Sequence, residues 1–122
     1  KQTKNIKKEN ENDSFVSFFI DGFKVMVGKN EKGNIELLKA SKKNDIWLHV
    51  KDIPSAHVII KTDKTNLPEF VIEFGAKLCV NLSKLNAGSY LVDYTPRRNV
   101  KPNDGANVTY VNYKTISVQK EN

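Results

Sequence analysis

The residues best suited to chemistry lie closest together between positions 45 and 60, where the chain reads DIWLHVKDIPSAHVII. This segment holds the only Trp, Trp47, and both His residues, His49 and His57, together with Lys51. Imidazoles serve as acids, bases or metal ligands, a large ring can stack on a base, and an ammonium group binds phosphate. Two His without a third credible ligand make a weak metal site, so we expect no metal and no cofactor. Trp47 is a candidate stacking platform, although burial in the core is the commoner fate of a Trp.

A second group of candidate residues follows an apolar run near the N-terminal third of the chain. Lys29 and Asn30 lie at an expected strand-to-helix exit, and Asn34 lies near the expected helix start. Backbone amides at a helix N-terminus bind phosphate well, and a nearby cation adds to this attraction. A capped helix on a lysine-rich surface is the alternative interpretation.

A third group is the densest basic cluster. It contains the only two Arg residues, Arg97 and Arg98, and Lys101 follows shortly after. A guanidinium group makes bidentate contacts to phosphate and can stack on a base. The alternative is a solvated loop, and here we favour contact with RNA.

The net charge is compatible with a polyanionic partner, although charge alone slightly favours the alternative of a soluble, lysine-rich surface. The 122 residues include 20 Lys and Arg against 14 Asp and Glu, which gives a net charge of +6. No basic amphipathic helix and no apolar run of roughly 18 residues accompanies this charge, so we expect no membrane partner. The single Cys, Cys79, excludes an internal disulfide and a cysteine-based zinc site, and it fits a cytoplasmic location.

These candidates are positioned by a predicted sheet. In the central segment Ile46, Leu48 and Val50 alternate with polar or aromatic residues, which is typical of a strand. Asp21-Gly22 between two apolar runs predicts a tight hairpin. We expect a further hairpin between the last two strands, across residues 112–114. The strands are expected over residues 16–20, 23–27, 46–51, 57–60, 89–95, 108–111 and 115–118.

Two helices are expected to pack on this sheet. A short helix covers about residues 34–40 with Asn34 as its N-cap, and a longer one covers residues 68–83. The stripe that should face the sheet in the longer helix recurs every four residues and consists of Phe70, Phe74, Leu78 and Leu82, and Val71 joins the same face. The fold class is therefore α+β, with a mostly antiparallel sheet of about seven strands, one long helix and one short helix. Residues 1–13 are interpreted as a flexible polar linker and residues 14–120 as a single domain.

The central segment resembles a known family. The block from Asp45 to Pro54, then His57-Val58, together with Val27-Gly28-Lys29-Asn30 and Asn34, is similar to the NFACT-R domain of the fibronectin-binding-protein-A-like proteins of the RqcH ribosome quality control family. The likeness continues through residues 92–95, 100–101 and 112–116. The chain departs from the family pattern at Lys29, where Arg is usual, at Ser55-Ala56, where Gly-Ser is usual, and at residues 105–107, where Pro-Gly is usual.

This resemblance implies a non-enzymatic domain that binds tRNA and rRNA of the large ribosomal subunit. It implies that other domains of a longer protein are partners, and that the whole factor supports C-terminal alanine tailing of nascent chains on stalled subunits. The alternatives are an enzyme acting on RNA or nucleotides through His49 and His57, and an adhesin-type module. The RNA-binding residues predicted on this basis are Lys29, Asn30, Asn34, His49, Lys51, His57, Arg97, Arg98 and Lys101, with Trp47 for stacking.

Overall fold

The computed structural model describes residues 6–121 of the chain. These residues form nine strands, two α-helices and one short 3-10 turn. In chain order they are β1 (Ile6–Glu11), β2 (Phe15–Ile20), β3 (Phe23–Gly28), α1 (Glu31–Ala40), β4 (Ile46–Val50), β5 (Val58–Lys61), α2 (Glu69–Asn81), β6 (Gly88–Pro96), η1 (Arg97–Asn99), β7 (Val100–Pro102), β8 (Val108–Tyr110) and β9 (Lys114–Lys120).

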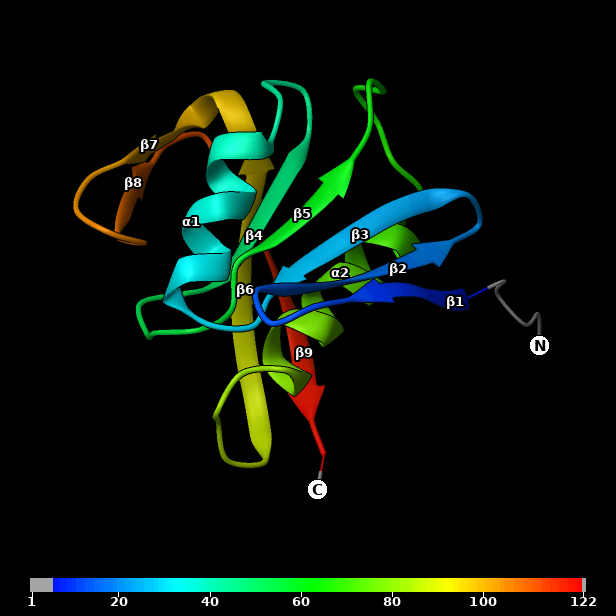
Figure 1. The fold of residues 1–122 in the computed structure, drawn as a ribbon. Coiled ribbons are helices and arrows are strands. Elements are labelled where there is room, and N and C mark those ends of the chain that lie inside the picture. The colour runs from blue at the N-terminus through cyan, green and yellow to red at the C-terminus, as the bar shows by residue number, and fades with distance from the viewer. Residues whose placement is uncertain (1–5, 122) are drawn as a thin grey trace.

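Seven of the strands form one antiparallel sheet in the order β1-β2-β3-β5-β4-β6-β9 (Figure 1). The expected β2–β3 hairpin is confirmed. Its turn residues Asp21 and Gly22 both have positive φ, as the tight hairpin turns require. The predicted central pair, β4 and β5, is antiparallel with Leu48 opposite Val58. The α+β class and the seven-stranded antiparallel sheet are therefore as predicted, although the two helices differ in length by less than expected.

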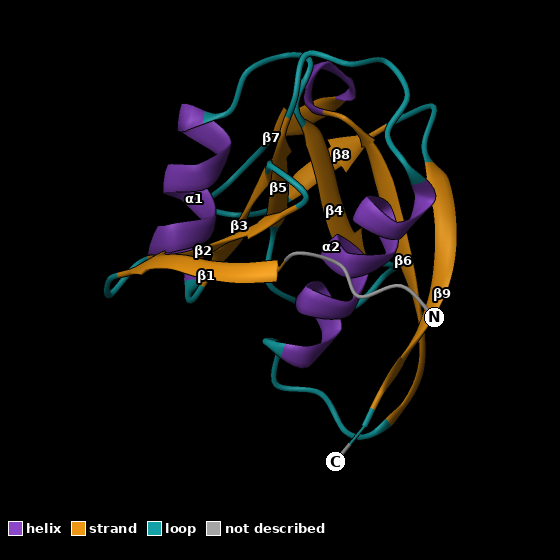
Figure 2. Ribbon diagram, turned by 90° about the vertical axis from the view of Figure 1, so that its right-hand side faces the viewer, coloured by secondary structure: helices purple, strands orange, loops and turns teal. Residues whose placement is uncertain are grey.

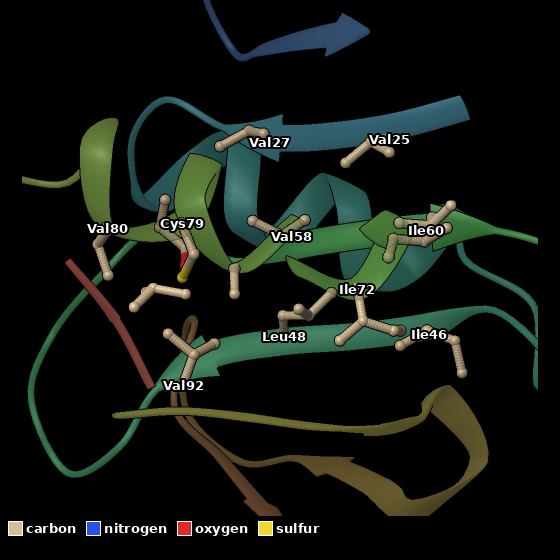
Figure 3. Close-up of a cluster of buried hydrophobic side chains, with 14 of the residues drawn as sticks. Val25, Val27, Ile46, Leu48, Val58, Ile60, Ile72, Cys79, Val80 and Val92 are labelled. Carbon is tan, nitrogen blue, oxygen red and sulfur yellow. The ribbon is translucent and has the colours of Figure 1, made fainter. Parts of the chain in front are cut away.

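The sheet is covered on both faces, which follows from the alternation in β4. Leu48 and Val50 belong to the larger core beneath α2, whereas Trp47 belongs to a second core beneath α1. Figure 2 shows the two helices on opposite sides of the strands. In the larger core, valine and isoleucine side chains of β3, β4 and β5 meet Ile72, Cys79 and Val80 of α2 (Figure 3). Burial on both faces fixes the register of β4, because a slip by one residue would exchange the two sets of side chains.

The face that α2 turns toward the sheet differs in part from the expected one: Val71 is buried as expected, whereas Phe70, Phe74 and Leu78 are only partly buried against the core. The buried residues are Val71, Ile72, Gly75, Ala76, Cys79 and Val80. Phe74 is half-buried with its ring edge-on to Phe18 at 6.1 Å, and Leu82 is 47% exposed beyond the end of the helix. A Cβ placed on Gly75 would lie 3.2 Å from Cδ1 of Ile60. Small residues thus let α2 approach the strands closely, and the larger aromatic residues flank the contact.

Two expectations about the ends of the chain are corrected by the strand pairing. Residues 108–111 and 115–118 do not form a hairpin, because β8 pairs with β7 in a separate two-stranded sheet and β9 pairs with β6. Residues 6–11 form the edge strand β1 rather than a flexible linker. Their side chains are exposed, so they lack the buried face on which strand recognition depends, and backbone pairing with β2 holds them in place. The linker expectation for residues 1–5 lies outside the described residues.

Candidate functional site

Four segments that are distant in the chain enclose a cleft of about 490 Å³. They are the start of α1, the connection between β4 and β5, the end of α2 and the loop between β7 and β8. Figure 1 shows the start of α1 and the β4–β5 connection at the same end of the molecule. The cleft brings together five of the predicted site residues, namely Lys29, Asn30, Asn34, His49 and His57. We call it the α1 cleft.

His57 forms part of the floor of the α1 cleft and is only 2% exposed. Its Nδ1 lies 3.0 Å from Nε1 of Trp47. An indole N–H can only donate, so Nδ1 is the acceptor and the imidazole proton resides on Nε2. Burial, together with the nearby His49, lowers the pKa of His57 to about 3. At neutral pH His57 is therefore an uncharged group whose Nδ1 is already occupied.

His49 lies beside His57, with ring centroids 4.8 Å apart. Its Nδ1 is 2.7 Å from the carbonyl oxygen of Val50. Because a carbonyl only accepts, Nδ1 carries the proton and Nε2 presents a lone pair. Burial lowers the pKa of His49 as well, so the ring is neutral at pH 7. Its Nε2 has no hydrogen-bond partner among residues 6–121, and no fully buried polar side-chain atom there lacks one. The lone pair therefore reaches open space, and His49 lines the α1 cleft.

The two predicted Asn residues have different roles from those expected. Asn30, rather than Asn34, caps α1, since its Oδ1 accepts a hydrogen bond from the Gly33 amide at 2.8 Å. Asn34 lies inside the helix, and its Oδ1 accepts from the backbone N–H of His57 at 3.1 Å. The sequence analysis predicted the N-cap one turn too late, at Asn34 instead of Asn30, because Asn is a favoured N-cap residue at either position. Both residues remain at the cleft.

Gly28 makes this arrangement of Asn34 possible. A Cβ added at Gly28 would lie 1.9 Å from Oδ1 of Asn34, a separation that no real pair of atoms tolerates. The end of β3 and the first turns of α1 therefore approach closely because position 28 has no side chain. This contact fixes Asn34 beside His57 at the floor of the cleft.

The charged side chains at the α1 cleft differ in whether they already make an ion pair within the fold. Nζ of Lys29 lies 2.7 Å from a carboxylate oxygen of Glu11 on β1 and 2.9 Å from the Asn12 carbonyl. Lys84 lines the same cleft and makes no ion pair within the described residues. Glu31 is the acidic residue on the lining. The rim of the cleft thus carries two ammonium groups and one carboxylate. Lys84 has no sequence signal beyond its charge, and only the fold brings it here.

The arginine cluster does not line the α1 cleft. Arg97 is half-buried, and its guanidinium donates to the carbonyl oxygens of Leu38 and Val100 and to Oγ of Ser41. It therefore ties the C-terminal end of α1 to η1 and β7. Arg98 is exposed and donates to Oδ1 of Asn44 at 3.1 Å, and Lys101 is also exposed. Arg98 and Lys101 are thus exposed, whereas the guanidinium of Arg97 is held by hydrogen bonds within the fold.

Lys51 belongs to a further polar cluster on the sheet. Its Nζ lies 3.2 Å from Oδ1 of Asp93 and 4.5 Å from the ring centroid of Tyr113. Asp93 is fully buried and also accepts from the hydroxyl groups of Tyr110 and Thr115. The sequence analysis assigned no role to Asp93 or Tyr110, because the strand pairing that joins them was not predicted. The cluster ties β4, β6, β8 and β9 together.

Trp47 is not available for stacking on a base. It is fully buried, and its ring packs on Tyr110 with centroids 4.7 Å apart and lies parallel to His49. The stacking assignment is therefore wrong and the core alternative is right. Within residues 6–121 no group of three or more His, Cys, Asp and Glu side chains is arranged to hold a metal ion. In the same range no helix is both long and apolar enough to cross a membrane.

Comparisons with known proteins agree with the early resemblance. Residues 14–112 match the family described as the NFACT protein RNA binding domain. The chain is 35% identical over 117 residues to Rqc2 homolog RqcH of Bacillus subtilis (strain 168), covering 93% of the chain and 20% of that protein. It is 27% identical over 111 residues to coiled-coil domain-containing protein 25 of Mus musculus, covering 81% of the chain and 53% of that protein.

A solved structure is similar as well. The C-terminal part of the fibronectin/fibrinogen-binding protein from Streptococcus suis superposes with a TM-score of 0.72 at 34% identity, covering 83% of the chain and 43% of that structure. The chain spans about a fifth of the length of the RqcH proteins it matches. Because the family match extends over most of the residues, the chain belongs to the NFACT protein RNA-binding domain family.

Proposed function

We propose that this chain is the RNA-binding domain of a ribosome-associated quality control factor, and that it contacts tRNA and the rRNA of stalled large subunits. The factor as a whole supports the addition of C-terminal alanine residues to stalled nascent chains, and the domain contributes binding rather than catalysis. Membership of the RNA-binding family is the observation that carries this proposal. The RqcH names of two bacterial relatives support the assignment to ribosome quality control.

The α1 cleft is the part of the surface that we assign to RNA. It collects Lys29 and Lys84 at its rim and the first turn of α1 at its side, and all three attract phosphate. Arg98 and Lys101 lie outside the cleft and extend the cationic surface. We assign them to contacts with the phosphate backbone, which add affinity without reading sequence.

The state of the two His residues favours this function over the enzymatic alternative. A general acid or base works best when its pKa lies near the operating pH. The pKa of His57 is about 3 and its Nδ1 is held by Trp47. The pKa of His49 is also lowered, and its Nδ1 is held by a carbonyl group. A pair fixed in this way is suited to presenting hydrogen-bonding groups.

Binding to tRNA and to large-subunit rRNA fragments tests the proposal. Fluorescence anisotropy at two salt concentrations should give an affinity that falls with salt, with a log–log slope of about −0.7 to −0.9 for each phosphate contact. Replacing Lys29 and Lys84 together by Ala should weaken binding to every RNA and reduce the slope by about 1 to 2. Lys77→Ala on the exposed side of α2 is the matched control for loss of charge, and it should leave both quantities unchanged. Absence of binding at low salt would refute the proposal.

A further inference from the structure

The floor of the α1 cleft presents both a hydrogen-bond donor and a hydrogen-bond acceptor. The lone pair of His49 Nε2 is an acceptor that reaches open space, and the His49 side chain lines both the α1 cleft and the smaller cleft beside it. Asn34 is 92% buried, and its Oδ1 is taken by the His57 amide. Its Nδ2 has no partner among the described residues, and since no fully buried polar atom there is unpaired, Nδ2 also reaches open space. The floor therefore holds one donor group and one acceptor, both on side chains fixed by other contacts.

The walls of the cleft are partly apolar. Pro54, Ala106 and Leu82 line it, and Leu82 is one of the few large apolar side chains that the fold leaves exposed, at 47%. A site for a lone phosphate has no use for an apolar wall. A flat ring does, because it gains contact with such a wall on its face while its edge meets polar groups.

We propose that the α1 cleft binds a single unpaired nucleotide of the RNA, with the edge of its base on Asn34 Nδ2 and His49 Nε2 and its phosphate near Lys29 and Lys84. This inference rests on the proposed function and deepens it, since it names the part of the RNA that enters. Every base edge offers a neighbouring acceptor and donor, whereas a phosphate offers acceptors alone. The acceptor at His49 therefore matches a base and opposes an anion. The volume of about 490 Å³ lies in the range of small-molecule sites.

The test compares 5′-mononucleotides with ribose 5-phosphate, which has the same sugar and phosphate but no base. Binding is followed by the NMR signals of the Asn34 side-chain amide and the His49 ring nitrogens. We expect mononucleotides to bind about tenfold tighter or more than ribose 5-phosphate, as is usual for a pair of base-edge hydrogen bonds. His49 Nε2 should stay unprotonated in the complex.

Asn34→Asp is the most informative variant. It keeps the oxygen that accepts from the His57 amide and replaces the Nδ2 donor by an acceptor, so the preference for mononucleotides over ribose 5-phosphate should be lost. Asn107→Asp introduces the same charge in the lining of the same cleft. This variant should weaken the binding of mononucleotides and of ribose 5-phosphate by the same factor, so the preference for mononucleotides should remain.

Three results would overturn the inference. Equal affinity for mononucleotides and ribose 5-phosphate would make the cleft a phosphate site. Protonation of His49 on binding would show the same, because an anion would pull a proton onto Nε2. Absence of any base-dependent change at Asn34 and His49 would remove the base from the cleft. In each case salt-dependent binding of whole tRNA would leave the proposed function standing, and loss of that binding would refute the proposed function as well.

Discussion

Replacement of Arg97 separates a structural role from a role in RNA binding. Its guanidinium makes four hydrogen bonds to three acceptors, two of which are backbone carbonyl groups of α1 and β7. Arg97→Ala removes all four bonds. Hydrogen bonds from a charged donor contribute about 1.5–3 kcal/mol each, but bonds made by one group are not additive, and Leu38 O retains a bond from Ser41 Oγ at 2.8 Å.

We therefore expect Arg97→Ala to lower the free energy of unfolding by about 2–3 kcal/mol. A domain of this size loses about 4 °C in Tm for each kcal/mol, so thermal denaturation followed by circular dichroism should shift down by about 8–12 °C. Arg98→Ala is the matched control. It removes one exposed bond to Asn44 and should change stability by less than about 0.5 kcal/mol.

The two variants should also differ in their effect on RNA binding. At a temperature where both proteins are folded, Arg98→Ala should weaken RNA binding, whereas Arg97→Ala should change it little. Equal and small losses of Tm in both variants would refute the structural role of Arg97. A large loss of affinity in Arg97→Ala alone would show that its guanidinium faces the RNA after all.

Three further changes have expected outcomes. His57 takes up a proton near pH 6.5 in the unfolded state and only near pH 3 in the native state. The free energy of unfolding should therefore fall as the pH drops below 6.5, by up to about 1.4 kcal/mol per pH unit. Denaturation at pH 7 and at pH 5 should show a smaller change of stability with pH in His57→Asn. Asp93→Ala leaves the hydroxyl groups of Tyr110 and Thr115 without their charged acceptor and should cost about 3 kcal/mol in urea unfolding, with Thr115→Ala costing about half as much. Phe74→Ala removes a half-buried ring and should cost about 2 kcal/mol, and a cost near 5 kcal/mol would contradict the packing described for α2.

The parts of the fold that could be predicted are those encoded by neighbouring residues. The alternation from Ile46 to Val50 gave the strand and its two buried faces, and Asp21-Gly22 gave the hairpin register. Pairing between distant strands has no such local signal. The run from residue 108 to 118 reads equally well as a hairpin, and only the structure shows that Thr95 Oγ1 donates to the carbonyl groups of Val111 and Asn112, where the chain leaves β8 for β9.

The candidate site was predictable in composition and not in arrangement. Lys29, Asn30, Asn34, His49 and His57 were chosen by type and family resemblance, and they do share one cleft. The contacts of Arg97 could not be predicted, because a charge in a sequence carries no information about burial. Its partners are backbone carbonyl groups, which every residue possesses.

The core and the α1 cleft are joined by a single series of contacts. Trp47 is held in the core beneath α1 and donates to His57, the backbone of His57 donates to Asn34, and Gly28 leaves room for Asn34. Each polar group of the cleft floor is thus fixed by an atom that cannot move without disturbing the core. A site ordered before its ligand arrives loses less conformational entropy on binding. Under the proposed function the buried Trp contributes to recognition without touching the RNA, and a substitution at position 47 should weaken binding and stability together.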